Sequence, residues 1–336
     1  MTDPADTREQ VARFQKSFSA LEKAVHELIV GQEDVVDGVL VALFAGGHVL
    51  LEGVPGIGKT MLVKTLGDAL HLQKSRIQFT PDLMPADVVG TLVLEEGAGG
   101  GRSLRFQPGP IHANLLLADE INRATPKTQS ALLEAMQEQQ VTAGGTTRKL
   151  PQPFVVVATQ NPVEQEGTYP LPEAQLDRFL FKLIVGYPRE SEYAAILART
   201  TSSVVPQVPQ VSSGEEILAL RKLVRDVPVP EAAQQLATRL VMGTQPQSPY
   251  ATERVNRFVM LGSSPRGAQA LVLAAKVAAL RDGRYAVSRE DVLRHALPAL
   301  RHRVLLNFEG LGAGLRTDEL VLELIERLGG GAARTK

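Results

Sequence analysis

The stretch Gly53-Val54-Pro55-Gly56-Ile57-Gly58-Lys59-Thr60 sets the architecture of this chain. It fits the pattern G-x-x-x-x-G-K-[ST] of a phosphate-binding loop, known as Walker A. An apolar segment at residues 48–52 precedes the loop and suits a buried strand, and apolar residues recur at helical spacing in residues 61–66. Strand, glycine loop and helix in this order place backbone N–H groups and a helix N-terminus around an anion. The sequence therefore predicts that this loop binds a nucleotide.

Each residue type in the loop has a chemical reason to be there. Glycines let the backbone approach phosphate groups without a Cβ atom in the way. Lys59 can reach the β- and γ-phosphates, and the Thr60 hydroxyl can bind Mg²⁺. A chance match by a glycine-rich turn is the alternative, and the flanking strand and helix argue against it. The predicted nucleotide-binding residues here are Gly53, Val54, Pro55, Gly56, Ile57, Gly58, Lys59, Thr60 and Met61.

Length and composition limit the class of protein. A chain of 336 residues is long for one core and suggests two domains. It has no cysteine, which excludes disulfides and thiolate metal sites and fits a reducing cytoplasm. The longest apolar run, residues 39–51, is too short to span a bilayer, and the acidic N-terminus is unlike a signal peptide. We therefore expect a cytoplasmic protein without a membrane segment.

Charge and aromatic content argue against a nucleic-acid partner. The net charge is −1, from 36 basic and 37 acidic residues, whereas nucleic-acid binders usually carry a basic excess. Aromatic residues make up only 4% and tryptophan is missing, so extensive base-stacking surfaces are not expected. A local basic channel formed by assembly stays open.

A second motif follows at residues 114–120, where apolar residues end in Asp119 and Glu120. This pattern predicts a buried strand, the third of a nucleotide-binding sheet, whose C-terminal end meets a polar site. Neighbouring residues on a strand point to opposite faces, so we expect the two acids to have different roles. Asp119 would hold Mg²⁺, and Glu120 would polarise the attacking water. An ordinary strand ending in two solvated acids is the alternative.

Two further candidates stand at strand ends. The apolar strand at residues 154–159 leads to Asn161, which should lie at the same sheet edge as Asp119. Its amide could position water or contact the γ-phosphate, although an asparagine before a proline also simply ends strands. Arg178 precedes the last expected core strand, residues 181–185. It is either a structural salt-bridge partner or an arginine finger that supplies positive charge to a transferring phosphate.

The rest of the first part reads as helices and hairpins. Amphipathic spacing predicts a helix over residues 8–29 and another over 33–44, with a corner at Val30-Gly31-Gln32 between them. Residues 80–85 are turn-rich and are expected to end any helix. Hairpins are predicted at about 91–106, around a glycine-rich tip, and at about 141–150, around paired glycines. The first hairpin is either a solvated excursion or a contact device.

Beyond residue 187 the sequence becomes helical. Residues 200–213 look like a linker, and Ser264-Pro265 is a typical start for a helix over residues 268–281. Arg266 would lie in the first turn of that helix and is the one candidate functional residue of this part. We expect a nucleotide-binding domain over residues 1–187, a helical domain over 188–336 and a disordered tail over 329–336.

Four segments together resemble the AAA+ ATPases and, among them, closely resemble the MoxR family. They are residues 53–60, 118–124, 158–162 and 166–179. The resemblance covers about residues 15 to 325. It implies a P-loop NTPase fold, an αβα sandwich with a five-stranded parallel sheet, followed by an all-α lid domain.

The resemblance also assigns roles to residues. Asn161 falls at the sensor 1 position, Arg178 at the arginine-finger position and Arg266 at the sensor 2 position. Val30 and Gly31 match the segment that borders the adenine, which replaces the interpretation as an ordinary corner. The hairpins correspond to the helix 2 insert and the pre-sensor 1 hairpin. Whether Arg266 acts on its own nucleotide or a neighbour's stays open, as does the role of Arg123.

The implied function is Mg²⁺-dependent hydrolysis of ATP at subunit interfaces of a ring, expected to be a hexamer. The catalytic set would be Glu120, Lys59, Asn161, Arg178 and Arg266, with Thr60 and Asp119 at the metal. The family implies chaperone-like remodelling, maturation or metal-cofactor insertion of a protein client, with a von Willebrand factor type A domain protein as partner in trans. The alternatives are a nucleic-acid motor, an assembly scaffold with little turnover and a P-loop kinase. Magnesium chelatase subunits are similar too, but residues 169–174 favour MoxR.

Overall fold

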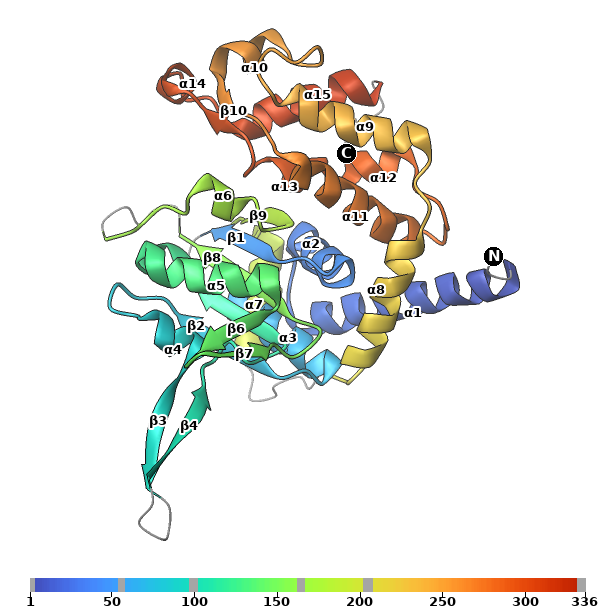
Figure 1. Ribbon diagram of the computed structural model, residues 1–336. Coiled ribbons are helices and arrows are strands. Elements are labelled where there is room, and N and C mark those ends of the chain that lie inside the picture. The colour runs from blue at the N-terminus through green and yellow to red at the C-terminus, as the bar shows by residue number, and fades with distance from the viewer. Residues whose placement is uncertain (1–3, 54–57, 97–101, 162–166, 202–207, 331–336) are drawn as a thin grey trace.

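The centre of the protein is a five-stranded parallel sheet with strand order β2-β5-β8-β1-β9 (Figure 1). The computed structural model describes residues 4–53, 58–96, 102–161, 167–201 and 208–330. The strands are β1 (Val49–Gly53), β2 (Lys74–Gln78), β5 (Leu115–Asp119), β8 (Val155–Gln160) and β9 (Phe181–Val185). This is the predicted αβα architecture, and the strand that ends in Asp119 is the third sheet strand along the chain.

Helices cover both faces of the sheet, as the apolar strands require. On β5, Leu115 and Leu117 belong to a core shared with α1 (Pro4–Leu28), α2 (Glu33–Ala45) and α3 (Lys59–Leu70). The alternate residues Leu116 and Ala118 face the opposite core, which α4 (Pro85–Val89) and α5 (Pro126–Glu138) cover. Residues 80–84 contain the predicted turn, and α4 begins at Pro85, because proline is tolerated in a first helical turn.

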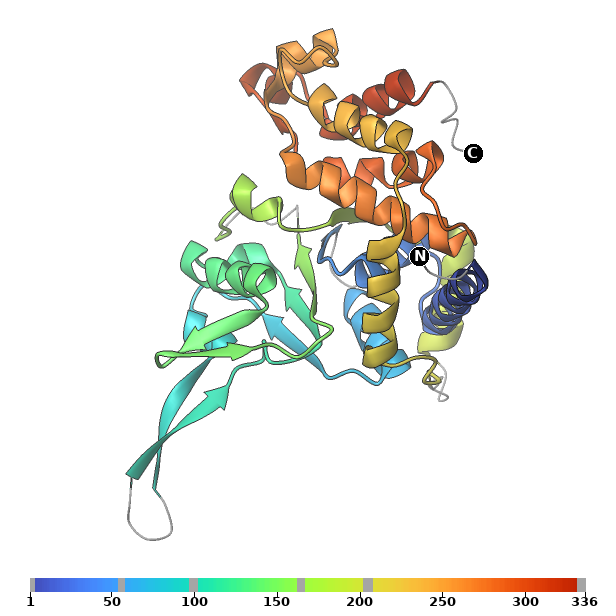
Figure 2. The same ribbon diagram turned by 45° about the vertical axis from the view of Figure 1, so that its right-hand side comes forward.

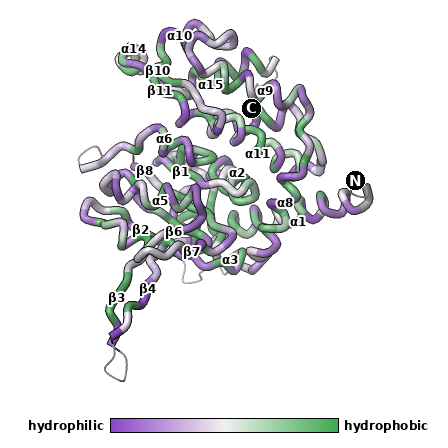
Figure 3. The backbone as a smooth tube through the Cα atoms, in the orientation of Figure 1, coloured by the Kyte–Doolittle hydropathy of each residue, from purple (hydrophilic) through white to green (hydrophobic). Residues whose placement is uncertain are grey.

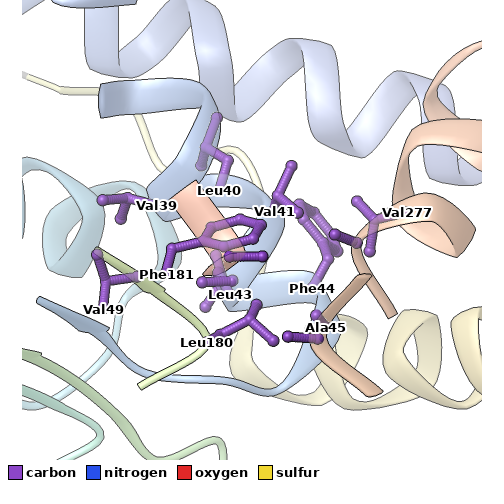
Figure 4. Close-up of a cluster of buried hydrophobic side chains, with 14 of the residues drawn as sticks. Val39, Leu40, Val41, Leu43, Phe44, Ala45, Val49, Leu180, Phe181 and Val277 are labelled. Carbon is purple, nitrogen blue, oxygen red and sulfur yellow. The ribbon is translucent and has the colours of Figure 1, made fainter. Parts of the chain in front are cut away.

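Helix α2 joins the sheet to the helical C-terminal part. Every residue from Val39 to Ala45 is buried, because α2 packs on β9 and also against α8 (Gly214–Asp226) and α11 (Pro265–Arg281). Figure 4 shows α2 side chains such as Leu40 and Phe44 clustered with Phe181 of β9 and Val277 of α11. One continuous apolar core therefore holds the two parts of the chain together.

Two antiparallel hairpins are present where the sequence predicts them. They are formed by β3 (Gly90–Glu96) with β4 (Arg102–Pro108), and by β6 (Gln140–Ala143) with β7 (Thr146–Lys149). The β3–β4 hairpin projects from the body (Figure 2), and its predicted glycine-rich tip lies outside the described residues. Although β3 projects, it carries hydrophobic residues, which the green colour of its tube marks in Figure 3.

The chain beyond the sheet is mostly helical. Its remaining helices are α7 (Glu190–Thr200), α9 (Glu231–Gly243), α10 (Glu253–Phe258), α12 (Arg289–Arg294), α13 (Ala296–Leu300), α14 (Phe308–Gly312) and α15 (Thr317–Gly329). A short antiparallel pair of β10 (Val259–Leu261) and β11 (Leu305–Leu306), which the sequence did not predict, joins them. The boundary at residue 187 stays a prediction, and most of the tail after Gly329 lies outside the described residues. No helix in the described ranges has the length and apolar character to cross a membrane.

Candidate functional site

A cavity of about 470 Å³ opens at the C-terminal edge of the sheet. We call it the phosphate-loop cavity, because it begins where the loop at residues 53–60 enters α3. Parallel strands all end at this edge, so polar residues that follow different strands meet there. The cavity is lined by Gly58, Lys59, Thr60, Met61, Lys64, Arg76, Gln78, Asp119, Glu120, Thr159 and Asn161. It brings together the predicted residues from the Walker A loop, the strand end at Asp119 and Asn161.

The described end of the loop is shaped for an anion. Gly58 has φ +86°, a left-handed conformation that favours glycine, and α3 begins at the next residue. The Lys59 Nζ donates a hydrogen bond of 2.7 Å to the carbonyl of Gly53, the last residue of β1. Burial lowers the pKa of Lys59, and the nearby Asp119 and Glu120 carboxylates oppose that shift. The predicted binding residues Val54, Pro55, Gly56 and Ile57 lie outside the described residues.

Asp119 ends β5, and both of its carboxylate oxygens have partners. The Thr159 hydroxyl donates to Oδ1 at 2.6 Å, and the Arg76 Nη2 donates to Oδ2 at 2.7 Å. Thr159 comes from β8 and Arg76 from β2, the two strands that flank β5. The carboxylate is thus held from both sides of its own strand.

Glu120 corrects the expectation that the two acids point to opposite faces. It follows the end of β5 with φ +56° and ψ +49°, so the strict alternation of a strand no longer applies. This left-handed conformation brings its carboxylate to the cavity that Asp119 also lines. There, Glu120 Oε2 accepts a hydrogen bond of 2.7 Å from the Gln78 side chain and pairs with Arg123 Nη1 at 3.1 Å. The two acids therefore share one cavity but have different partners.

Thr159, Arg76 and Gln78 are site residues that the sequence did not single out. Thr159 is 1% exposed, and besides donating to Asp119 it accepts the Glu120 backbone N–H at 2.9 Å. The pairing of Ala118 with Ala158 places Thr159 beside Asp119. The sequence did contain a signal for Thr159, because it is a polar residue near the end of an otherwise apolar strand. Asn161 follows β8 directly and is buried in the cavity wall.

The cavity has oxygen donors of the kind that Mg²⁺ prefers. Thr60 supplies a hydroxyl and Asp119 a carboxylate, and both line the same space. Magnesium usually binds one or two protein carboxylates together with phosphate oxygens and water. The donor set therefore fits a magnesium ion that is bound together with a phosphate group.

Arg178 and Arg266 lie elsewhere, in a cavity of about 260 Å³ that we call the arginine cavity. Arg178 Nη1 donates to the Leu133 carbonyl at 2.5 Å, whereas its buried Nε has no hydrogen-bond partner within the part of the chain that the structure describes. Arg266 lies in the first turn of α11, as predicted, and its Nη1 is 3.8 Å from Asp177 Oδ2. Within one chain, then, neither arginine joins Lys59 in the phosphate-loop cavity.

Arg303, another residue that the sequence did not single out, anchors the helical part next to the arginine cavity. It is buried, and its Nε donates to Asp177 Oδ1 at 2.8 Å. Its other nitrogens donate to the carbonyls of Phe179 at 2.6 Å and Leu180 at 3.2 Å. Burial lowers the pKa of Arg303, and Asp177 opposes that shift. The segment that carries Arg178 is thereby bonded to the helical part.

Val30 and Gly31 lie at the turn between α1 and α2. Gly31 has φ +66°, a left-handed conformation that favours glycine, and the carboxyl end of the Glu192 side chain of α7 packs against it. Neither residue is among those that line the two cavities described above. Their role at an adenine stays a prediction.

Comparison with known proteins divides the chain as the structure does, into a sheet part and a helical part. Residues 48–181 match the model of the ATPase family associated with various cellular activities (AAA), and residues 251–323 match an AAA lid domain. The chaperone MoxR1 of Mycobacterium tuberculosis is 44% identical over 91% of this chain and 79% of its own length. Protein MoxR of Paracoccus denitrificans is 30% identical over 88% of this chain and 91% of its own.

The fold has a close counterpart among solved structures. The crystal structure of a proposed ATPase from Cytophaga hutchinsonii superimposes with a TM-score of 0.89 at 37% sequence identity. The match covers 96% of this chain and 97% of that one. The similarity therefore extends over both the sheet and the helical part.

Proposed function

Because the chain belongs to the MoxR family of AAA+ ATPases, we propose that it hydrolyses ATP with Mg²⁺ at the interfaces of a ring of its own copies. The single observation that carries this proposal is the division of the predicted residues between two cavities. Lys59, Thr60, Asp119, Glu120 and Asn161 line one cavity, whereas the two arginines line another. A site with this division is completed by a neighbouring copy.

Within one chain, the phosphate-loop cavity binds the phosphates and the metal. Lys59 and the N-terminus of α3 hold the phosphate groups, and Thr60 and Asp119 hold Mg²⁺. The bound metal supplies positive charge that neutralises the phosphate oxygens. Water attacks the γ-phosphorus, the bond to the bridging β–γ oxygen breaks, and Glu120 accepts the proton of the water. Asn161 orients the water or the γ-phosphate.

The neighbouring copy supplies the remaining charge. Arg178 is only half-buried and lines the arginine cavity, so its guanidinium can supply positive charge to the phosphate of an adjoining copy. Arg266 lines the same cavity, which supports action in trans for both arginines. An arginine finger stabilises the charge of the transition state, and its loss typically costs about 10³-fold or more in kcat.

The energy of hydrolysis would serve a protein client. We propose chaperone-like remodelling, such as maturation or metal-cofactor insertion, by a cytoplasmic hexamer that works with a von Willebrand factor type A domain protein. The chaperone name of the Mycobacterium tuberculosis relative supports this class of role. The charge balance gives no support to a nucleic-acid client.

The test measures specific ATPase activity against protein concentration. We expect activity to rise with concentration, because isolated copies lack the neighbour's arginines. Lys59→Ala should lose nucleotide binding, whereas Glu120→Gln should bind ATP without turnover. Glu120→Gln with ATP should also retain a client and the partner protein that Lys59→Ala does not. A specific activity that is independent of concentration would contradict the ring, and full function of Glu120→Gln in cells would favour a scaffold.

A further inference from the structure

Thr159 makes contacts that the roles proposed above do not explain. Its hydroxyl donates a hydrogen bond to Asp119 Oδ1 at 2.6 Å and accepts one from the Glu120 backbone N–H at 2.9 Å. One side-chain oxygen on β8 is therefore bonded to two consecutive residues at the end of β5. At 1% exposure, Thr159 has no access to bulk water that could replace either bond.

The two bonds determine how each acid is presented. A hydroxyl has one proton, and because Thr159 accepts the Glu120 N–H, that proton is directed to Asp119. Thr159 thus fixes Oδ1, while Arg76 holds Oδ2 at 2.7 Å, so the orientation of the Asp119 carboxylate is set from both neighbouring strands. The bond from the Glu120 N–H to Thr159 also stabilises the left-handed conformation of Glu120. This conformation brings the Glu120 carboxylate to the cavity that Asp119 lines.

Packing alone does not require a threonine at this position. Val155 and Val157 precede Thr159 at alternate positions of β8, and both belong to the apolar core on that face of the sheet. Valine has nearly the shape of threonine and is suited to a buried strand. What distinguishes threonine from valine here is the hydroxyl and its two hydrogen bonds.

We propose that Thr159 is a positioning residue that sets the metal-binding Asp119 and the water-activating Glu120 relative to each other. This inference rests on the proposed ATPase function. In this role Thr159 acts through the two acids to which its hydroxyl is bonded. Its removal should therefore impair turnover and magnesium dependence much more than it impairs nucleotide binding.

The experiment compares Thr159→Val, which keeps the shape, with Thr159→Ser, which keeps the hydroxyl, in the full chain. For Thr159→Val we expect kcat to fall about 10- to 100-fold, the effect of a small misplacement of reacting groups. The affinity for a fluorescent ATP analogue in EDTA should stay within about threefold, and the Mg²⁺ concentration that half-saturates the metal-dependent binding should rise. Thr159→Ser should have a kcat and a half-saturating Mg²⁺ concentration close to those of wild type.

Thr128→Val is the matched control for lost stability. Thr128 is also fully buried, and its hydroxyl donates to the Leu83 carbonyl at 2.7 Å, away from the lining of the phosphate-loop cavity. It should lower the melting temperature much as Thr159→Val does, with kcat and the Mg²⁺ dependence unchanged. In a double-mutant cycle, Thr159→Val should reduce the small residual single-turnover hydrolysis of Glu120→Gln by a much smaller factor than it reduces that of wild type.

The possible failures are distinguishable. If wild type hydrolyses ATP and Thr159→Val matches it in kcat and in Mg²⁺ dependence, only the positioning role is overturned. Equal losses in Thr159→Val and Thr128→Val, or no recovery in Thr159→Ser, would also overturn it, because both results indicate general destabilisation. If wild type neither binds nor hydrolyses ATP, the proposed function is overturned together with this role.

Discussion

His48 directly precedes β1 and is buried, and its two ring nitrogens have different partners on β8 and α5. Nδ1 accepts the Val156 backbone N–H at 3.0 Å, so the ring proton lies on Nε2, 3.1 Å from the Met136 carbonyl that accepts it. The structure thus specifies one neutral tautomer. Burial lowers the pKa of His48 to about 4, although the bond to Met136 acts in the opposite direction.

This histidine should make folding sensitive to mild acid. In the unfolded chain the His48 ring is protonated near pH 6.5, whereas in the folded chain it is protonated only near pH 4. The contribution of neutral His48 to the free energy of unfolding is therefore fully present above pH 6.5 and is lost as the pH falls toward 4. Between pH 7 and 4.5 we expect the free energy of unfolding to drop by about 2–3 kcal/mol from this residue. Urea unfolding at several pH values measures it.

His48→Gln is the control, because a glutamine amide can donate to Met136 and accept from Val156 without titrating. His302 is also buried with a lowered pKa, so the difference between wild type and His48→Gln isolates the share of His48. The same pH dependence in both proteins would show that His48 does not carry this effect.

At the scale of elements, the two hairpins support each other. Arg148 of β7 stacks on the Phe106 ring of β4 at 3.8 Å, and Leu92 of β3 packs against Gly144 at the turn of β6–β7. Farther out, Leu94 pairs with Leu104, and both are exposed. Because a two-stranded hairpin is marginally stable in water, the inner contacts decide how firmly the projecting hairpin is held.

Adjacent glycines at that turn allow a matched test. Gly144 and Gly145 both have positive φ, so alanine at either position should cost about 1 kcal/mol of stability. A Cβ atom on Gly144 would also lie 2.4 Å from Leu92 Cδ1, whereas one on Gly145 would have no atom within 4 Å. We expect Gly144→Ala to be the more destabilising by about 1 kcal/mol and to raise amide exchange in β3. Equal effects in urea unfolding and hydrogen exchange would show that the hairpins are not coupled there.

Across the whole molecule, Arg303 is a buried polar link between the sheet and the helical part. Replacing it with methionine would leave Asp177 without its buried partner and would remove the bonds to two carbonyls. We expect Arg303→Met to lower the free energy of unfolding by about 3–5 kcal/mol, as for other broken buried ion pairs. Arg257, which pairs with Glu309 on the surface, is the control and should change stability by less than about 1 kcal/mol when replaced with methionine. Urea unfolding distinguishes the two, and equal losses would contradict the anchoring role of Arg303.

The proposed ring makes a prediction about mixtures of variants. Arg178→Ala keeps the phosphate-loop cavity intact, and Glu120→Gln keeps the arginine, so each alone should be almost inactive. In an equal mixture that assembles at random, about a quarter of the interfaces combine an intact cavity with an intact arginine. ATPase activity should therefore reappear on mixing, up to about a quarter of the wild-type rate. No recovery from mixed and reassembled subunits would argue that Arg178 acts within its own chain.

Contiguous residues were enough to predict much of this protein. The loop at residues 53–60, the strand ends at Asp119 and Asn161 and the two hairpins are each encoded within a few neighbouring residues. Short-range patterns of this kind depend on backbone conformation and on the alternation of apolar residues, which a sequence displays directly. The parallel sheet then follows, because its strands alternate with helices.

Contacts between distant segments required the fold. Thr159 is bonded to Asp119 only because β5 and β8 pair in one register, and Arg303 meets Asp177 only because the helical part packs on the sheet. Glu120 departs from the alternation of β5 because it follows the end of that strand and itself has a left-handed backbone conformation. Local patterns predicted the elements and the polar residues at their ends. The partners of each acid and the separation of the two arginines from the phosphate-loop cavity depend on how remote segments pack. The energy of such packing depends on pairs of residues that are far apart in the sequence, and the sequence around each residue does not indicate its partner.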